Sequence, residues 1–346
     1  MLCRSASSVQ LLALPQAGMI PEELLPPGGK VDLFAVHSRL NVEEHRRVVH
    51  RDARWVTIVR EPTSVFESLY SFYGIARWYS LDVTELKKVP LEVREPAPFL
   101  CVGLFSRGCD SFPLLGKRSA TRFGSDVSNV CLTPQKLKAF PRFGDIFGKN
   151  QMLFDLGFPD DLSEARLRQA IQETDRLFDL VMVAERMDES LVLLRHLLCW
   201  SLHDVVVFAK NARREGVRPA LDAHTRRTLR ELNGADGRLY EHFLAKHQRA
   251  VLDFGVRRMA REVAALRSLR ERYFEACGVL RVEGHNPFPK FREYSGLVGA
   301  YATDSDDEQC QRLSFSEIAL LDEARDRQVA FLEKARLSQQ KSGSDV

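Results

Sequence analysis

Several features that identify common classes of protein are missing from these 346 residues. No apolar run approaches the ~20 residues that a membrane-spanning helix needs, and the short run that begins at Val9 is stopped by Pro15. The chain has no N-x-S/T glycosylation site. A net charge of only +3 argues against nucleic-acid binding by the protein as a whole. These absences predict a soluble globular protein whose charged ligands, if any, are held by local clusters.

The seven cysteines include no CxxC pair and no His/Cys spacing that suits zinc. We therefore expect no metal site. An odd number of cysteines is compatible with a few disulfides and one free thiol, and equally with seven thiols. Cysteine content therefore does not distinguish an oxidising from a reducing compartment.

The chain does contain a regular alternation of strand-like and helix-like segments. Apolar runs rich in β-branched residues predict buried strands at Val31–Val36, Trp55–Val59, Phe178–Ala184 and His203–Phe208. Helical spacing predicts helices at 62–74, 162–176, 189–200, 222–232, 240–276 and 316–337. Strands that alternate with helices predict an α/β sandwich around a mostly parallel sheet.

Composition also predicts the domain organisation. Residues 1–22 carry no clear element and stay unassigned, and residues 23–300 are expected to form the main domain. Residues 301–346 are expected to form a linker with the acidic run 304–308, a C-terminal helix and a polar tail. Residues 93–135 show neither the alternating pattern of a strand nor the 3.6-residue pattern of a helix. We therefore expect an irregular insertion that is either disordered or an artefact of the gene model.

The most informative segment runs from Ile58 to Ser68. Arg60 stands at the carboxyl end of a predicted strand, and the helix that follows carries Ser68. Open α/β sheets bind ligands at such strand ends, and a guanidinium, a hydroxyl and helix-start amides together suit a phosphate. The alternative is that Arg60 closes the strand and pairs with a carboxylate such as Glu67. On chemistry alone this alternative is the commoner one.

Other charged groups have simpler interpretations. Glu185, Asp188 and Glu189 stand at a strand-to-helix junction, where we expect them to cap the helix. The arginines between 257 and 272 are expected to form the solvated face of an amphipathic helix.

With Pro62 and Phe66, the Arg60 to Ser68 segment resembles the 3′-phosphate-binding element of Golgi sulfotransferases. More narrowly, it resembles the galactose 3-O-sulfotransferases, a family that includes galactosylceramide sulfotransferase. Further stretches that are similar to this family occur in the same order at 37–41, 148–157, 185–200, 211–214 and 259–263. Together the matches cover about 31–79 and 137–277.

The resemblance implies a P-loop-like three-layer sandwich and 3′-phosphoadenosine 5′-phosphosulfate (PAPS) as co-substrate. It implies that Arg60 and Ser68 bind the 3′-phosphate of PAPS. Asn211 and Arg213 would touch the cofactor or the acceptor, or only close a loop. His37 becomes the candidate general base, the alternative being an imidazole bonded to a backbone carbonyl. No metal is required, because cationic side chains and amides can stabilise the developing charge.

The implied activity is transfer of sulfate from PAPS to the 3-hydroxyl of galactose on a galactosylceramide-like glycolipid or a glycan. The implied setting is the Golgi, with a type II membrane anchor. Family members carry that anchor and a lysine-containing, Ser/Thr-rich loop for the 5′-phosphosulfate. Neither is found in this sequence, so we expect an N-terminally incomplete chain. Two alternatives stay open: a glycosaminoglycan-type sulfotransferase, and an inactive module that binds 3′-phosphoadenosine 5′-phosphate (PAP) and glycan.

Overall fold

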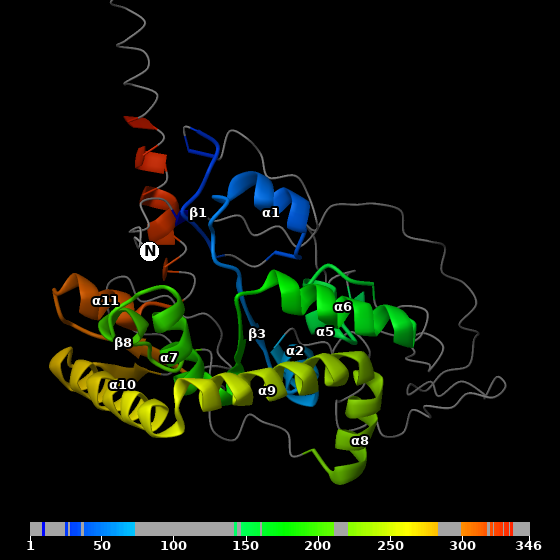
Figure 1. Ribbon diagram of the computed structural model, residues 1–346. Helices are drawn as coiled ribbons and strands as arrows, with labels where there is room; N and C mark the ends of the chain where they lie inside the picture. Colours follow the sequence, from blue (N-terminus) through cyan, green and yellow to red (C-terminus); the bar gives the residue numbers. More distant parts are fainter. Residues whose placement is uncertain are drawn as a thin grey trace, which may run out of the picture. The chain divides into compact units, whose positions relative to one another are not determined.

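The computed structural model describes residues 9–10, 25–26, 28–35, 38–72, 142–143, 147–159, 161–210, 221–282, 299–316, 319–320, 322–327, 329–331 and 333–334 (Figure 1). The chain divides into two compact units. The first comprises Met1–Arg60, Met152–Arg218 and Arg238–Val346, and the second comprises Glu61–Gln151 and Pro219–Gly237. The insertion expected at 93–135 lies outside the described residues.

A short parallel sheet lies in the first unit. Strand β3 (Val56–Val59) pairs with β6 (Leu180–Val183) in parallel, with Val56 opposite Leu180 and Val59 opposite Val183. The β-branched and aliphatic side chains suit this pairing, and the last valine of each strand is almost fully buried. The strands predicted at 55–59 and 178–184 are therefore confirmed.

A second parallel pair accounts for part of the first predicted strand. Strand β2 (Leu33–Phe34) pairs with β1 (Val9–Gln10), and Val31 forms an isolated parallel bridge with Val49. The strand predicted at 31–36 is thus confirmed over two residues, while its last residue, Val36, lies outside the described part of the chain.

Two helices of the first unit begin at side-chain caps, and one of them, α1 (Val42–Val48), was not expected from the sequence. Asn41 caps α1 (Val42–Val48) and Ser163 caps α6 (Glu164–Leu177) through their side-chain oxygens. The short helix α5 spans Gln151–Asp155, where the two units meet along the chain. The 3₁₀ turn η3 (Ala184–Arg186) leads from β6 into α7 (Met187–Leu197).

Two predictions for the first unit are wrong. Residues 203–208 do not form a strand; they begin with a 3₁₀ turn, η4 (His203–Val205), because Asp204 accepts hydrogen bonds from the backbone and hydroxyl of Ser201 and stabilises a turn. The single helix predicted at 240–276 is two helices, α9 (Gly234–Phe254) and α10 (Val256–Ala276). Gly255 separates them with φ 95°, a backbone conformation that no helix contains. Figure 1 shows the change of direction.

One core cluster joins these elements. Eight buried side chains from β6, α7, the 203–206 segment and α10 pack together; they are Met182, Leu191, Val192, Val205, Val206, Met259, Leu266 and Leu269. At 25–30 cal/mol per Å² of buried apolar surface, a fully buried side chain of this size contributes about 1.5–3 kcal/mol. The cluster therefore fixes α7 and α10 against the end of β6.

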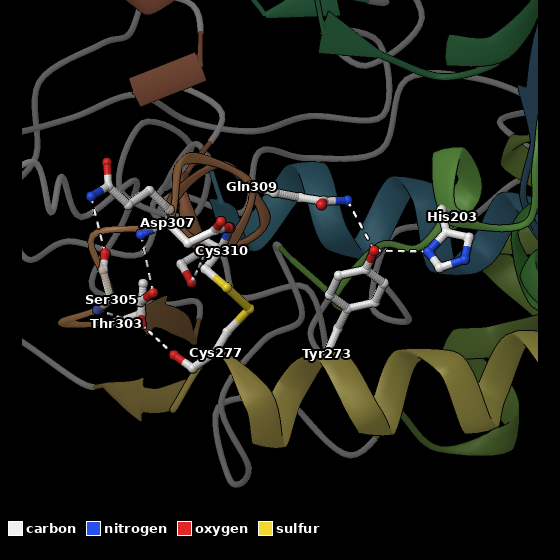
Figure 2. The surroundings of a disulfide bond; sticks show 10 residues. His203, Tyr273, Cys277, Thr303, Ser305, Asp307, Gln309 and Cys310 are labelled. Carbon is white, nitrogen blue, oxygen red and sulfur yellow. Dashed lines mark hydrogen bonds between the residues drawn. A yellow bond between two sulfur atoms is a disulfide. The ribbon is translucent and has the colours of Figure 1, made fainter.

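The end of the chain forms a disulfide-linked hairpin region. Strands β7 (Leu280–Val282) and β8 (Ala300–Ala302) pair antiparallel, and helix α11 (Glu308–Ser314) follows. A disulfide joins Cys277, at the end of α10, to Cys310 in α11 (Figure 2). Sequence reasoning missed α11, which Asp307 caps through Cys310 N–H. Described residues between 319 and 334 are helical, in agreement with the predicted C-terminal helix.

The second unit is mainly helical where it is described. It contains α2 (Pro62–Phe72), α8 (Ala223–Leu232) and the antiparallel pair β4 (Arg142–Phe143) and β5 (Phe147–Gly148). Helix α2 packs against α8. Asn150 accepts from Asp236 N–H and donates its own N–H to Asn233, at 3.2 and 2.9 Å. The helices predicted from Pro62 and from Asp222 are confirmed, with Asp222 as the cap of α8.

Among the residues that the structure describes, no helix is long and apolar enough to cross a membrane.

Candidate functional site

The carboxyl ends of β3 and β6 meet at one edge of the parallel sheet. Because Val59 lies opposite Val183, Arg60 and Ala184 leave the sheet side by side. The backbone N–H of Arg60 donates to the sulfur of Met152 at 3.3 Å. This edge is where open α/β sheets bind ligands, so the structure places one predicted cofactor residue, Arg60, at a position that suits that role.

The chain leaves β6 through a tightly fixed turn. The hydroxyl of Ser190 accepts from Val183 N–H at 3.0 Å and donates to Val183 C=O at 3.3 Å. Both groups are fully buried, so this clip satisfies backbone atoms that would otherwise be costly to bury. The turn between β6 and α7 is therefore held in one conformation.

Asp188 and Glu189 lie in the first turn of α7, where negative charge favours a helix start, but neither is the capping residue that the sequence predicted. The capping position is Arg186, with no side-chain hydrogen bond to the helix. Glu185 accepts from the Tyr240 hydroxyl at 3.2 Å, and Glu189 lies 3.3 Å from Nε2 of the buried His247. Asp188 accepts from two arginines of α10. The carboxylates that we expected to cap α7 thus form their contacts with side chains of α9 and α10.

Arginine contacts set the charge state of Asp188. Burial alone would raise the pKa of this carboxyl, but hydrogen bonds and charge from Arg270 and Arg267 outweigh burial, and the pKa lies below its ordinary value. Asp188 is therefore ionised and structural near neutral pH.

The carboxylate of Glu61 binds the backbone amides at the start of α2. The two carboxylate oxygens of Glu61 accept from the backbone N–H groups of Thr63 and Ser64, at 3.2 and 2.8 Å. Burial would raise the pKa of Glu61, yet the hydrogen bonds from Thr63 and Ser64 lower it overall. The backbone amides in the first turn of α2, which we expected to bind a phosphate, are thus bonded to Glu61. Ser68 lies further along α2 and is half-buried.

Three predicted site residues cannot be placed. His37, Asn211 and Arg213 lie outside the described residues. Arg60 and Ser68 are described, but they belong to different units of the chain. The predicted site residues therefore stay predictions as a set.

The structure gives a role to Arg39, which lies in the family-like stretch 37–41. Arg39 donates to the carbonyls of Phe154, Gly157 and Phe158 at 3.0–3.2 Å, and its guanidinium lies 4.3 Å from the centre of the Phe154 ring. Arg39 thereby joins two of the stretches on which the family resemblance depends, 37–41 and 148–157.

Gly157 completes this junction. Its φ is 90°, and a Cβ atom there would lie 2.5 Å from the carbonyl oxygen of Leu40. Leu40 N–H in turn donates to Asp155 C=O at 2.7 Å. Only glycine permits so close an approach of the two backbones.

No group of three or more His, Cys, Asp or Glu side chains within the described ranges is arranged to hold a metal ion.

Comparison with known proteins decides the family. The sequence profile of the galactose-3-O-sulfotransferases matches residues 93–284, which is more than half of the chain. The chain belongs to the galactose-3-O-sulfotransferase family. The match includes the 93–135 segment, β6 and helices α6 to α10, and it begins after Arg60 and Ser68. The profile match also includes four of the stretches that resemble the family, at 148–157, 185–200, 211–214 and 259–263.

Individual relatives agree with this assignment. Galactosylceramide sulfotransferase of Bos taurus is 33% identical over 253 residues, which cover 72% of this chain and 51% of the relative. Galactose-3-O-sulfotransferase 3 of Homo sapiens is 31% identical over 250 residues, covering 71% and 49%. Galactose-3-O-sulfotransferase 2 of Homo sapiens is 30% identical over 306 residues, covering 84% and 66%.

The chain spans about half the length of the first two relatives and about two thirds of the third. No solved structure matches it. Family membership relates the chain to the galactose-3-O-sulfotransferases. The structure shows that its fold is of the α/β type, with a small parallel sheet.

Proposed function

We propose that this protein transfers a sulfuryl group from PAPS to the 3-hydroxyl of a galactose on a galactosylceramide-like glycolipid or a glycan. Membership of the galactose-3-O-sulfotransferase family is the observation that carries the proposal. We further propose a P-loop-like three-layer sandwich formed mainly by residues 23–300, and a Golgi location. The acceptors named for the relatives, galactosylceramide and galactose, supply the substrate class.

The reaction needs three things from the chain. The acceptor hydroxyl attacks sulfur while the bond between sulfur and the bridging phosphate oxygen breaks, so the hydroxyl must be aligned opposite the leaving PAP. A base must take the hydroxyl proton, the role that we propose for His37. Cations and hydrogen-bond donors must stabilise the negative charge that grows on the leaving phosphate. No metal is needed in this scheme.

Arg60 and Ser68 are proposed to bind the 3′-phosphate that distinguishes PAPS from other adenine nucleotides. The position of Arg60 at the carboxyl edge of the β3–β6 pair supports its part. Because Glu61 occupies the first amides of α2, the proposed contacts to phosphate come from side chains. Asn211 and Arg213 are proposed as further cofactor contacts.

Titration with PAP and with adenosine 5′-monophosphate tests the cofactor site. Replacing Arg60 by Ala should weaken PAP binding roughly tenfold to a hundredfold, because a charge-assisted hydrogen bond contributes about 1.5–3 kcal/mol. Binding of the monophosphate, which lacks the 3′-phosphate, should change little. Arg54→Ala is the matched control, because Arg54 lies on the same segment and pairs with Asp179 at 2.8 Å. Equal losses for both nucleotides would contradict the assignment.

Transfer of labelled sulfate from PAPS to galactosylceramide, lactose and a glycosaminoglycan then tests the reaction. Transfer to galactose acceptors supports the proposed enzyme. Preference for the glycosaminoglycan supports the alternative sulfotransferase. PAP binding without transfer to any acceptor supports an inactive binding module, and failure to bind PAP would contradict all three.

A further inference from the structure

Glu189 is a partly exposed carboxylate that lies close to the carboxyl ends of β3 and β6. Its neighbour Ser190 bonds both backbone groups of Val183, the last residue of β6. Val183 lies opposite Val59, which Arg60 follows. The first turn of α7, which contains Glu189, is therefore fixed against the strand end that is adjacent to Arg60.

A buried histidine of α9 holds one oxygen of this carboxylate. Nε2 of His247 lies 3.3 Å from Oε2 of Glu189, and the two side chains are 1% and 30% exposed. Because a carboxylate only accepts hydrogen bonds, Nε2 is the donor. Oε1 of Glu189 has no hydrogen-bond partner within the described residues. The histidine thus fixes the carboxylate and leaves its second oxygen available to a ligand.

The second ring nitrogen of His247 indicates a role other than packing. Nδ1 is buried and has no hydrogen-bond partner in the part of the chain that the structure describes. Burial of an imidazole with one unsatisfied nitrogen costs free energy, which an apolar side chain of similar size would avoid. Such a cost is explained if Nε2 is needed to hold Glu189 in one orientation, since residues that meet a ligand are commonly fixed by a supporting hydrogen bond.

A second carboxylate of the same segment is held in a similar way. Glu185 accepts a hydrogen bond from the Tyr240 hydroxyl at 3.2 Å. Tyr240 and His247 lie two helical turns apart on one face of α9. The sheet edge therefore has a cation, Arg60, after β3 and two carboxylates after β6.

This distribution of charge suits the two ligands of a sulfuryl transfer. Carboxylates repel the phosphates of PAPS, so the segment after β6 does not suit the cofactor. Sugar hydroxyls are hydrogen-bond donors, and an ionised carboxylate is a strong acceptor for them. An acidic sugar would bring a further negative charge towards Glu185 and Glu189, whereas galactose would not.

We propose that Glu189, positioned by His247, binds a ring hydroxyl of the acceptor and selects neutral galactose over acidic sugars. This inference rests on the proposed function. It adds a residue for the acceptor to the residues proposed for the cofactor, and it favours galactose acceptors over glycosaminoglycans.

Titration of the PAP-saturated protein with methyl β-galactoside and with methyl β-galacturonide, followed by NMR, is the test. The two sugars differ only at C6, which carries a hydroxymethyl group in one and a carboxylate in the other. Glu189→Gln should weaken galactoside binding roughly fivefold or more, because a charge-assisted hydrogen bond becomes a neutral one. It should also narrow the preference for the galactoside over the galacturonide. Binding of PAP should not change.

Asp175→Asn is the matched control. Asp175 also contacts a histidine of α9, with Oδ2 lying 3.1 Å from Nε2 of His242, but it precedes β6 and so lies towards the amino end of that strand. Its substitution should leave the affinities for both sugars unchanged.

Two substitutions of His247 test the positioning role. His247→Gln keeps an N–H donor for Glu189 and should retain most of the galactoside affinity. His247→Leu removes the donor and should weaken galactoside binding several-fold without changing PAP binding. Thermal unfolding shows whether His247→Leu is folded; if it is not, the Glu189→Gln titration decides the question by itself.

The outcomes separate this inference from the proposed function. Equal galactoside affinity in wild type and Glu189→Gln overturns the role of Glu189 and leaves the sulfotransferase proposal standing. A parallel loss of affinity for both sugars and PAP, or a wild type that prefers the galacturonide, also overturns it. If the wild type binds PAP but neither sugar, the acceptor role is wrong and the cofactor site stands. If the wild type binds neither PAP nor sugar, both proposals are wrong.

Discussion

Oδ1 of Asp188 accepts a hydrogen bond from Nη2 of Arg270 at 2.6 Å, which joins the first turn of α7 to α10. Arg267 adds a second bond to Oδ2 at 2.7 Å, but its own side chain is largely exposed. The two helices flank the end of β6, so this pair sets the position of the turn beside Arg60.

Asp188→Asn should lower the free energy of unfolding by about 1–3 kcal/mol, since Arg270 would lose its charged partner in a partly buried place. Urea unfolding at pH 7 measures the change. Arg267→Ala is the control and should cost less than about 1 kcal/mol, because an exposed pair contributes little. Equal effects of the two substitutions would contradict this account.

The lowered pKa of the Asp188 carboxyl predicts that the stability of the folded chain depends on pH. Its pKa in the folded chain lies below the unfolded value, so its stabilising effect is complete above that unfolded value and is lost as pH falls through the folded one. The stability difference between wild type and Asp188→Asn should therefore shrink below about pH 4. A difference that stays constant from pH 7 to pH 3 would contradict the assigned pKa direction.

Gly157→Ala should destabilise the first unit by at least about 2 kcal/mol, because the positive φ is strained for alanine and the new Cβ meets the Leu40 carbonyl. Gly237→Ala provides a contrast of opposite sign. Gly237 lies inside α9 with open space where its Cβ would be, so alanine there should stabilise by about 0.5–1 kcal/mol. Thermal unfolding of both variants measures the pair of effects.

Reduction of the Cys277–Cys310 disulfide should lower stability by about 2–4 kcal/mol, because the bond closes a loop with a sequence separation of 33. The double variant Cys277→Ala/Cys310→Ala should show the lower melting temperature with or without dithiothreitol. Cys199→Ser is the control, since Cys199 is a free, exposed thiol. If dithiothreitol leaves the wild-type melting temperature unchanged, the disulfide does not contribute as described.

Burial lowers the pKa of Lys210 to about 8, which predicts that the free energy of unfolding increases at alkaline pH. Below pH 8 the lysine is protonated in both states, and burial penalises the folded one. Between pH 8 and the unfolded value near 10.5 the folded chain releases its proton first, so stability rises with pH. Wild type should gain stability relative to Lys210→Met between pH 7.5 and pH 9.5 in urea titrations. A constant difference would contradict the desolvation of Lys210.

Local patterns predicted the elements whose sequence signals are consistent with their tertiary surroundings. The β-branched runs at Val56–Val59 and Leu180–Val183 are strands, and the helices predicted at 162–176 and 222–232 are α6 and α8. These signals act within a few residues, so they can be detected without knowledge of the fold.

Tertiary contacts explain the failures. Residues 203–208 are as apolar and β-branched as a strand, but Asp204 and Ser201 form a turn. Val205 and Val206 pack into the core, while Val207 is exposed. Glu185, Asp188 and Glu189 stand where capping residues stand, yet their partners on α9 and α10 are 55 to 82 residues away in sequence. Contacts at such separations leave no local pattern.

The candidate site was predictable to a similar extent. The place of Arg60 at the end of a strand could be predicted, because a β-branched run is a local signal, while its role in ligand binding stays a prediction. His37 was assigned through family resemblance and stays a prediction.

Glu61 gives the start of α2 an unusual property. By bonding to two backbone amides of its own helix, the carboxylate fills the place of an external anion, so that turn is complete in the unliganded protein. Arrival of a phosphate at those amides would be an exchange of one oxyanion for another. The observed affinity would then report only the difference between the two, and removing the Glu61 charge would tighten anion binding there while loosening the helix.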